Sequence, residues 1–310
     1  MAMWNPWRGC KKYSEGCKYC YIHKGDSKRN VDTNEIVKTK DFYKPIESLK
    51  NGNYKVKSGI VYLCFSTDFL IEEADEWRKE CWDMIRERSD LTFLFLTKRI
   101  ERFLQCIPED WNDGYDNVIV CCTIENQERA DFRLSYFRNL PIKHKCITAQ
   151  PLIEGIDIEK YLDDIELVVV GGESDYNARP LYYDWVLNIR EQCMRKKVNF
   201  EFRQCGTHFI KDGKQFVPSA STGQRRLLSI ILRIAQAQYF SEITNKKPIL
   251  LMDDVLLELD PDKRQKVTSF LPEYDQLFCT FLPGEPYEKY KRTTTKIYFI
   301  EKGSWSERTL

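Results

Sequence analysis

Short apolar runs and longer amphipathic stretches alternate along much of the chain. Six runs rich in β-branched and aromatic residues fit buried strands: GIVYLCFSTDF (59–69), LTFLFLTK (91–98), NVIVCCTIEN (117–126), KCITAQPL (145–152), IELVVVGGES (165–174) and NFEFRQCG (199–206). Most are apolar on both faces, as strands of a parallel sheet under helices are. Between several of them, 72–89, 127–140 and 183–197 carry apolar residues at helical spacing. This alternation predicts βαβ units and a parallel α/β sheet.

Each of these predicted strands ends in small or polar residues. The ends are Ser66-Thr67-Asp68, Thr97-Lys98, Thr123-Ile124-Glu125-Asn126, Gln150-Pro151, Gly171-Gly172-Glu173-Ser174 and Gln204-Cys205-Gly206. The carboxyl ends of parallel strands gather the active site in such folds. We therefore expect one shared site at this edge of the sheet.

The pattern changes after Phe216, which predicts two domains, 1–216 and 217–310. Residues 217–240 read as a turn and a long apolar helix. Residues 246–265 read as a buried strand that ends in two aspartates, followed by a turn and a charged helix. Two further strands are predicted at 276–281 and 296–303.

Composition and charge add little to this picture. The chain has 310 residues, 42% hydrophobic and 31% charged, with a formal net charge of +1. No global charge attracts it to nucleic acid or to an acidic membrane. The sequence shows no secretory signal and no run of about 18 apolar residues. We therefore expect no membrane span and a cytoplasmic protein whose 12 cysteines are reduced.

Three cysteines lie close together in WNPWRGCKKYSEGCKYCYIHKG (4–25), namely Cys10, Cys17 and Cys20. Structural zinc needs a fourth ligand, which His23 would supply, so Zn²⁺ is one interpretation. The other is a [4Fe–4S] cluster held by three thiolates, with one iron left open for a ligand. Both interpretations remain open on the spacing alone.

The order of motifs resembles a known group of proteins. A three-cysteine loop ahead of a six-fold βα pattern resembles the radical S-adenosylmethionine superfamily, although the spacing here is six then two residues and not three then two. With WNPWRGC, SEGCKYCY, LTKR, GGES and RQCG, residues 1 to about 212 resemble the phage-associated three-Cys-motif proteins, a radical-SAM-like family. The resemblance implies a partial (β/α)6 barrel of the TIM-like type.

The same resemblance implies a cofactor site. Cys10, Cys17 and Cys20 would hold the cluster, and S-adenosylmethionine would bind the open iron. At the GGES strand end, two glycines let a backbone approach a ligand closely, and two polar side chains offer hydrogen bonds. The expected cofactor-binding residues there are Gly171, Gly172, Glu173 and Ser174.

The carboxyl-terminal segment carries motifs of another kind. Ser221-Thr222-Gly223-Gln224 opens the predicted long helix, and a helix N-terminus of this kind binds anions. The strand ILLM (249–252) ends in Asp253 and Asp254, as the Walker-B pattern for Mg²⁺ and water does, and Leu259-Asp260 follows. STGQRR and DDVLLELD resemble the carboxyl-terminal part of RecF, an ABC-type, SMC-like ATPase of DNA repair.

That resemblance implies roles for five residues. Ser221, Gly223 and Gln224 would contact a phosphate of the ATP bound by a partner subunit, and Asp253 would reach Mg²⁺. Asp260 would lie on the dimer face, where it would belong to the nucleotide-binding residues. A sixth residue, Asp254, would act catalytically by positioning water.

The sequence contains no P-loop G-x-x-x-x-G-K-[ST]. A half ABC-ATPase-like α/β segment of this kind is not expected to hydrolyse ATP alone. It would share ATP and Mg²⁺ with a P-loop-bearing ATPase partner, or it is an inactive remnant of a gene junction.

Three hypotheses of function follow. The first is an S-adenosylmethionine-dependent iron–sulfur enzyme of unknown substrate, with a nucleic acid or nucleotide expected from family context alone. The second is a RecF-type replication and repair protein that binds ATP and single-stranded DNA. The third is an adaptor that carries zinc or a cluster and does no chemistry.

Overall fold

The computed structural model describes residues 2–215, 222–253, 261–282, 287, 291, 293–301 and 303–308. The chain divides into two compact units, Met1–Val217 (unit 1) and Pro218–Leu310 (unit 2). Each unit is described by itself.

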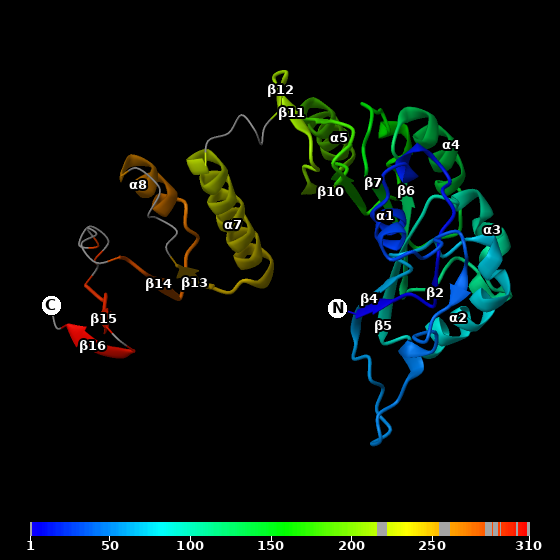
Figure 1. Ribbon diagram of the computed structural model, residues 1–310, viewed down its shortest axis with the longest axis horizontal. Helices are drawn as coiled ribbons and strands as arrows, with labels where there is room; N and C mark the ends of the chain where they lie inside the picture. The colour runs from blue at the N-terminus through cyan, green and yellow to red at the C-terminus, as the bar shows by residue number, and fades with distance from the viewer. Residues whose placement is uncertain are drawn as a thin grey trace. The chain divides into compact units, whose positions relative to one another are not determined.

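Unit 1 is a mixed α/β structure built on a curled sheet of seven parallel strands, which forms a half-barrel (Figure 1). In spatial order the strands are β1 (Ala2–Trp4), β4 (Gly59–Leu63), β5 (Leu91–Thr97), β6 (Val118–Thr123), β7 (His144–Ala149), β8 (Leu167–Gly171) and β10 (Asn199–Gln204). The parallel α/β sheet predicted from the six apolar runs is confirmed, and β1 adds an edge strand.

Three of the five described α-helices of unit 1 lie within the predicted amphipathic stretches. They are α1 (Tyr21–Lys28), α2 (Asp75–Glu87), α3 (Phe103–Cys106), α4 (Gln127–Phe137) and α5 (Tyr183–Lys196). The helices α2, α3 and α4 lie along one side of the sheet in Figure 1. Short strands complete the unit: β2 (Trp7–Arg8), β3 (Val37–Lys38), β9 (Leu181–Tyr182), β11 (Phe209–Lys211) and β12 (Lys214–Gln215).

One large hydrophobic core joins this sheet to its helices. Strand β5 shows the underlying pattern, because its residues alternate between buried and half-buried positions. Phe93 and Phe95 are fully buried on the helix side, together with Phe69 and Trp82. Burying four aromatic side chains of this size contributes several kcal/mol, at roughly 25 cal/mol per Å² of apolar surface.

Unit 2 contains α7 (Thr222–Thr244), β13 (Ile249–Met252), α8 (Pro261–Ser269), β14 (Gln276–Cys279), β15 (Ile297–Glu301) and β16 (Ser304–Arg308). Strands β13 and β14 are parallel, whereas β15 and β16 form an antiparallel pair. The buried strand predicted before the two aspartates has exposed positions, since Ile249 is 60% and Leu251 75% exposed. These side chains are exposed because α7 covers only one face of the two-stranded sheet and they lie on the other face.

No helix within the described ranges is long and apolar enough to cross a membrane.

Candidate functional site

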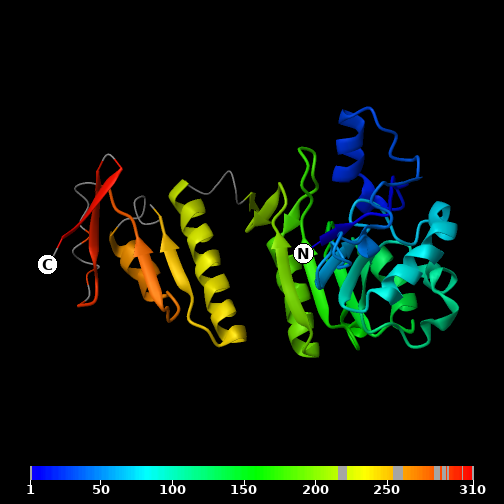
Figure 2. The same cartoon turned by 90° about the horizontal axis from the view of Figure 1, so that it is seen from below.

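Cys10, Cys17 and Cys20 lie on one stretch at the carboxyl ends of the strands of unit 1. We call residues 10–20 the cysteine loop. It contains the 3-10 helix η1 (Glu15–Cys17), and Cys20 is the N-cap residue of α1. All three thiols are half-buried. Figure 2 shows α1 and the blue chain around it beyond one end of the sheet.

A first ion pair holds the start of the cysteine loop. Arg99, just after β5, donates from Nη1 to Oδ2 of Asp68 at 3.0 Å. Its Nη2 donates to the carbonyl oxygen of Lys11 at 2.9 Å. The hydroxyl of Thr97 also donates to Asp68, at 2.8 Å. The carboxylate that follows β4 therefore orients the arginine that binds the loop.

A second ion pair lies under the middle of the loop. Nη1 of Arg133, on α4, donates to Oε2 of Glu125 at 2.6 Å, and both side chains are 0% exposed. The backbone N–H of Gly16 donates to Oε1 of the same carboxylate at 3.4 Å. A Cβ atom at Gly16 would lie 3.2 Å from Cδ of Glu125, so the loop packs directly on this carboxylate.

A third ion pair holds η1. Arg179 donates from Nη2 to Oε1 of Glu173 at 2.7 Å and from Nε to Oε2 at 3.1 Å. Nη2 also donates to the carbonyl oxygen of Glu15 at 2.9 Å. This arrangement repeats the first pair, in which a strand-end carboxylate orients an arginine that binds a loop carbonyl.

The three acids follow alternate strands of the sheet, because Asp68 comes after β4, Glu125 after β6 and Glu173 after β8. We call the three acid–arginine pairs the clamps. Charge-assisted hydrogen bonds in buried surroundings are among the strongest in proteins. The clamps therefore fix a loop that has little regular structure of its own to the edge of the sheet where the strands have their carboxyl ends.

The electrostatic surroundings of Cys10 contain opposing contributions. Burial raises the pKa of the Cys10 thiol to about 12, and the negative charge of Asp68 acts in the same direction. The guanidinium of Arg99 acts against both and lowers the pKa of this thiol. The neighbouring thiols Cys17 and Cys20 raise it further. A cation bound at this position would favour the thiolate form, as a metal ion does.

The donor set of the loop has the chemistry of a soft-metal site, with three sulfur atoms within eleven residues. Among the described residues, however, no group of three or more His, Cys, Asp or Glu side chains has the arrangement of a metal site. Metal binding by Cys10, Cys17 and Cys20 therefore stays a prediction, supported by donor chemistry and by the clamped loop.

A cavity of about 280 Å³ opens beside Cys20. It is lined by Lys12, Lys18, Tyr19, Cys20, His23, Lys24 and Asp175. Burial and the charge of Lys12 lower the pKa of His23, which favours the neutral imidazole that metals bind. His23 thus shares a cavity with one of the three thiols.

The GGES strand end (171–174) packs closely against neighbouring segments of unit 1. A Cβ atom at Gly172 would lie 2.4 Å from the carbonyl oxygen of Cys205, and one at Gly171 would lie 3.0 Å from Cδ of Gln150. Glycine is therefore required at Gly172 by the approach of the neighbouring backbone. Ser174 accepts a hydrogen bond from Nε2 of Gln204 at 3.0 Å.

In unit 2, Asp253 directly follows β13, and its Oδ1 accepts a hydrogen bond from the hydroxyl of Thr280 at 2.7 Å. Ser221, Asp254 and Asp260 lie outside the described residues. Gly223 and Gln224 belong to the first turn of α7, but the structure does not describe the Gln224 side chain.

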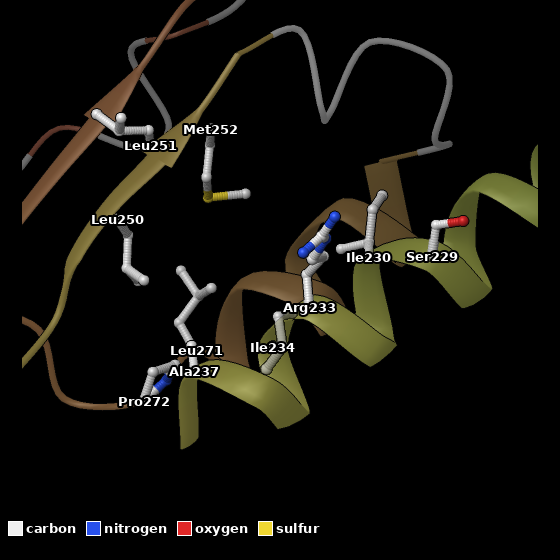
Figure 3. Close-up of a pocket in the computed structure, with 10 residues that line it drawn as sticks. All are labelled: Ser229, Ile230, Arg233, Ile234, Ala237, Leu250, Leu251, Met252, Leu271 and Pro272. Carbon is white, nitrogen blue, oxygen red and sulfur yellow. The ribbon is translucent and has the colours of Figure 1, made fainter. Parts of the chain in front are cut away.

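A cavity of about 350 Å³ lies between α7 and β13 in unit 2 (Figure 3). Ile230, Arg233 and Ile234 extend from α7 toward the strand that carries Leu250 and Met252. The lining is largely apolar, with Arg233 as its charged member. The cavity lies beside the small hydrophobic core of unit 2, and Asp253 is not among the residues that line it.

No sequence pattern indicates Arg133, and Asp68 and Glu125 stand out in the sequence only as polar residues at strand ends. The sequence does contain one signal, which is an acidic residue after every second strand of the sheet. The arginine partners carry no such signal, because their pairing depends on how a loop or helix packs over the strand ends.

A family model described as "Protein of unknown function (DUF5131)" matches residues 1–253. The match covers all of unit 1 and extends into unit 2. No solved structure is significantly similar to the chain.

Curated relatives of another kind match about a third of the chain. The chain is 56% identical over 100 residues to "DNA replication and repair protein RecF" of Treponema pallidum, covering 32% of this chain and 28% of that protein. It is 31% identical over 110 residues to RecF of Lactobacillus delbrueckii subsp. bulgaricus, covering 34% and 29%. It is 33% identical over 96 residues to RecF of Oenococcus oeni, covering 31% and 26%. The chain thus spans less than a third of the length of these relatives.

Proposed function

The chain belongs to the DUF5131 family of proteins of unknown function, and on this premise we propose that its carboxyl-terminal unit acts in DNA replication and repair as part of a RecF-like ATPase. The observation that carries the proposal is the 56% identity to RecF over 100 residues. In this proposal unit 2 completes the nucleotide site of a P-loop-bearing partner, since the sequence has no P-loop of its own.

The described part of unit 2 supports this role at one position. A Walker-B acid follows a strand of a parallel sheet, where its carboxylate reaches Mg²⁺. Asp253 has that place after β13, which pairs in parallel with β14. Thr280 holds its carboxylate at 2.7 Å, on the adjacent strand end. We assign Asp254 to water positioning, and Ser221, Gly223, Gln224 and Asp260 to the face that meets the partner's ATP.

ATP hydrolysis tests this function directly. The full chain alone is expected to show none, whereas mixing it with full-length RecF of Treponema pallidum is expected to change the RecF rate. Asp254→Asn should abolish the change, and Asp262→Asn, which removes the same charge in the first turn of α8, should preserve it. Hydrolysis by the chain alone, or a RecF rate unaffected by the chain, would contradict the proposal. The second result would support an inactive gene-junction remnant.

For the amino-terminal unit we propose a separate function as a radical-SAM-like iron–sulfur domain. The specific observation in its favour is that the clamps hold the cysteine loop at the carboxyl edge of a parallel half-barrel. Cys10, Cys17 and Cys20 would hold a [4Fe–4S] cluster, which when bound would supply an electron to S-adenosylmethionine. The lysine-lined cavity beside Cys20 would receive the carboxylate end of such a ligand. A nucleic acid or nucleotide is the proposed substrate class.

Iron and sulfide analysis after anaerobic purification tests the second function. Cys10→Ser, Cys17→Ser and Cys20→Ser should each lower iron and sulfide content, whereas Cys193→Ser, in the core, should not. An EPR spectrum that changes when S-adenosylmethionine is added would support the cofactor assignment. One stoichiometric zinc per chain that is lost in His23→Ala would replace it with the structural zinc site.

A further inference from the structure

Arg133 differs from the other two clamp arginines. It is fully buried, and its Nη1 donates to the carbonyl oxygen of Thr123 at 2.8 Å and to Glu125 at 2.6 Å. Its Nε and Nη2 have no hydrogen-bond partner among the described residues. Arg99 and Arg179 each bind both a carboxylate and a loop carbonyl. A buried guanidinium with two unpaired donors is costly, and such a group in a native fold calls for a ligand or an ion.

The two unpaired donors of Arg133 indicate the shape of that ligand. Nε–H and one Nη2–H point in the same direction from one edge of the planar guanidinium. This edge binds two acceptor oxygens side by side, as in bidentate arginine–carboxylate pairs. The unpaired edge of Arg133 therefore matches a carboxylate.

Tyr13 also contacts a carboxylate that has an acceptor unpaired within the described ranges. The ring of Tyr13 lies 5.6 Å from the guanidinium carbon of Arg133, and its hydroxyl donates to Oε1 of Glu101 at 2.5 Å. Oε2 of Glu101 is buried and has no partner in the described part of the chain, and the same holds for Oγ of Ser14. One tyrosine thus contacts both a guanidinium that lacks acceptors and a carboxylate that lacks a donor.

The two arginines at the Tyr13 ring, their carboxylate partners and Glu101 together favour a zwitterionic ligand over a strongly anionic one. Arg99 and Arg133 are the cations that contact its ring. Asp68 and Glu125 pair with them, which leaves the carboxylate of Glu101 uncompensated among these five groups. A ligand that brings a carboxylate and an ammonium together satisfies both the arginine and the glutamate. A phosphate monoester would bring a second negative charge toward Glu101.

We propose that unit 1 binds a small zwitterionic amino acid beneath Tyr13 and Ser14, with the ligand carboxylate on Nε and Nη2 of Arg133 and its ammonium on Oε2 of Glu101. The binding groups come from the cysteine loop, from the 3-10 helix η4 (Ile100–Arg102) and from α4. Tyr13 is 38% exposed and covers Arg133, so it must move aside for the ligand to enter. The site requires neither a metal nor unit 2, so it goes beyond both proposed functions.

Thermal denaturation of the full chain at constant ionic strength tests this site with glycine as the probe. Glycine is expected to raise the melting temperature along a saturable curve. Acetate, which lacks the ammonium, should act more weakly, and methylammonium should have no saturable effect. Arg133→Lys keeps the charge but loses the fork, and should raise the glycine Kd at least about tenfold, which corresponds to the loss of one charge-assisted hydrogen bond.

The matched control is Arg78→Lys. Arg78 is also buried, but its Nε, Nη1 and Nη2 donate to Phe69, Asp75 and Ile71 respectively. This variant should lose stability yet keep the glycine response. If Arg133→Lys does not fold, Glu101→Gln provides the second test, since it should remove the preference for glycine over acetate.

Three results would overturn the proposal. They are the absence of a saturable glycine response, an unchanged glycine Kd in Arg133→Lys, and equal responses to glycine and acetate in the wild-type chain.

Discussion

Asp68 and Arg99 form an ion pair of 3.0 Å in which each side chain is less than a tenth exposed. The pair connects two strand ends of the sheet to the cysteine loop, because Arg99 also binds the carbonyl oxygen of Lys11. The backbone N–H of Lys98 donates to the same carboxylate at 3.1 Å. Asp68 therefore has a structural role at the site, in that it positions the arginine beside Cys10.

Replacing Asp68 with alanine should destabilise the chain and release the start of the cysteine loop. Removing one partner of a buried ion pair leaves the other charge uncompensated, which costs about 3–5 kcal/mol. Urea denaturation should show this loss. Mass spectrometry after a short iodoacetamide pulse should show faster labelling of Cys10. An unchanged labelling rate at Cys10 would mean that the clamp does not hold the loop.

The control for this prediction is the exposed pair of Glu76 and Lys79, which are 3.1 Å apart with side chains 82% and 73% exposed. Glu76→Ala should change stability by less than about 0.5 kcal/mol, since solvent screens such pairs. It should leave Cys10 labelling as it is in the wild-type chain.

Gly9, just before the cysteine loop, should tolerate no side chain. Its φ is +93°, and a Cβ atom there would lie 2.3 Å from the carbonyl oxygen of Glu35. Gly9→Ala should cost about 3 kcal/mol or more, since backbone strain and a clash with backbone act together. Gly213→Ala is the matched control, because φ is +70° but nothing lies within 4 Å. It should cost only about 1–2 kcal/mol. Equal losses in urea denaturation would show that the clash at Gly9 is relieved.

Much of unit 1 could be predicted because its strands are apolar on both faces. The runs around Phe93 and Val120 are strongly β-prone and largely apolar in sequence, as is typical of strands in a parallel sheet covered by helices. The sequence does not predict strand β1, since Ala2–Trp4 is too short to show any periodicity. It becomes a strand only because β4 offers a parallel edge.

The candidate site could be predicted only in part. The sequence indicated that polar strand ends gather at one edge, and the cysteine loop does lie there. Its contacts were not predictable, since Asp68 and Arg99 are brought together by adjacent strand ends. The sequence predicts that Gly172 lets its backbone approach a ligand closely, and in the structure the backbone of Cys205 makes such a close approach. A glycine that lies beside a ligand can be told from one that lies beside another strand only when the position of the neighbouring strand is known.

The pH dependence of stability should include a contribution from Asp110. Its carboxylate accepts hydrogen bonds from Arg86 at 2.7 Å and from Tyr115 at 2.8 Å, and these lower its pKa in the folded state, with Arg86 as the larger cause. A carboxyl with a depressed folded pKa stabilises the fold above its unfolded pKa, about 3.9 for aspartate. This contribution is lost as the pH falls through the folded pKa.

An NMR titration of the Asp110 carboxyl carbon should therefore show a pKa below the unperturbed value. Arg86→Gln should raise that pKa and flatten the acid limb of the stability curve. Arg190→Gln removes a charge that makes no contact with Asp110, and it should change neither. A normal Asp110 pKa in the wild-type chain would show that these hydrogen bonds do not persist in solution.

Filling the cavity in unit 2 should stabilise α7. Ala237 lines the apolar space of about 350 Å³ opposite β13, whereas Ala235 on the same helix is exposed. Ala237→Leu adds three carbons to a space bounded by Ile234 and Leu271, and should gain about 1 kcal/mol. Ala235→Leu makes the same change in helix propensity without the cavity, and should stay within about 0.5 kcal/mol. Hydrogen exchange of the α7 amides measures both, with slower exchange expected only for Ala237→Leu. Equal protection in the two variants would attribute the effect to the helix itself and not to the packing of α7 on β13.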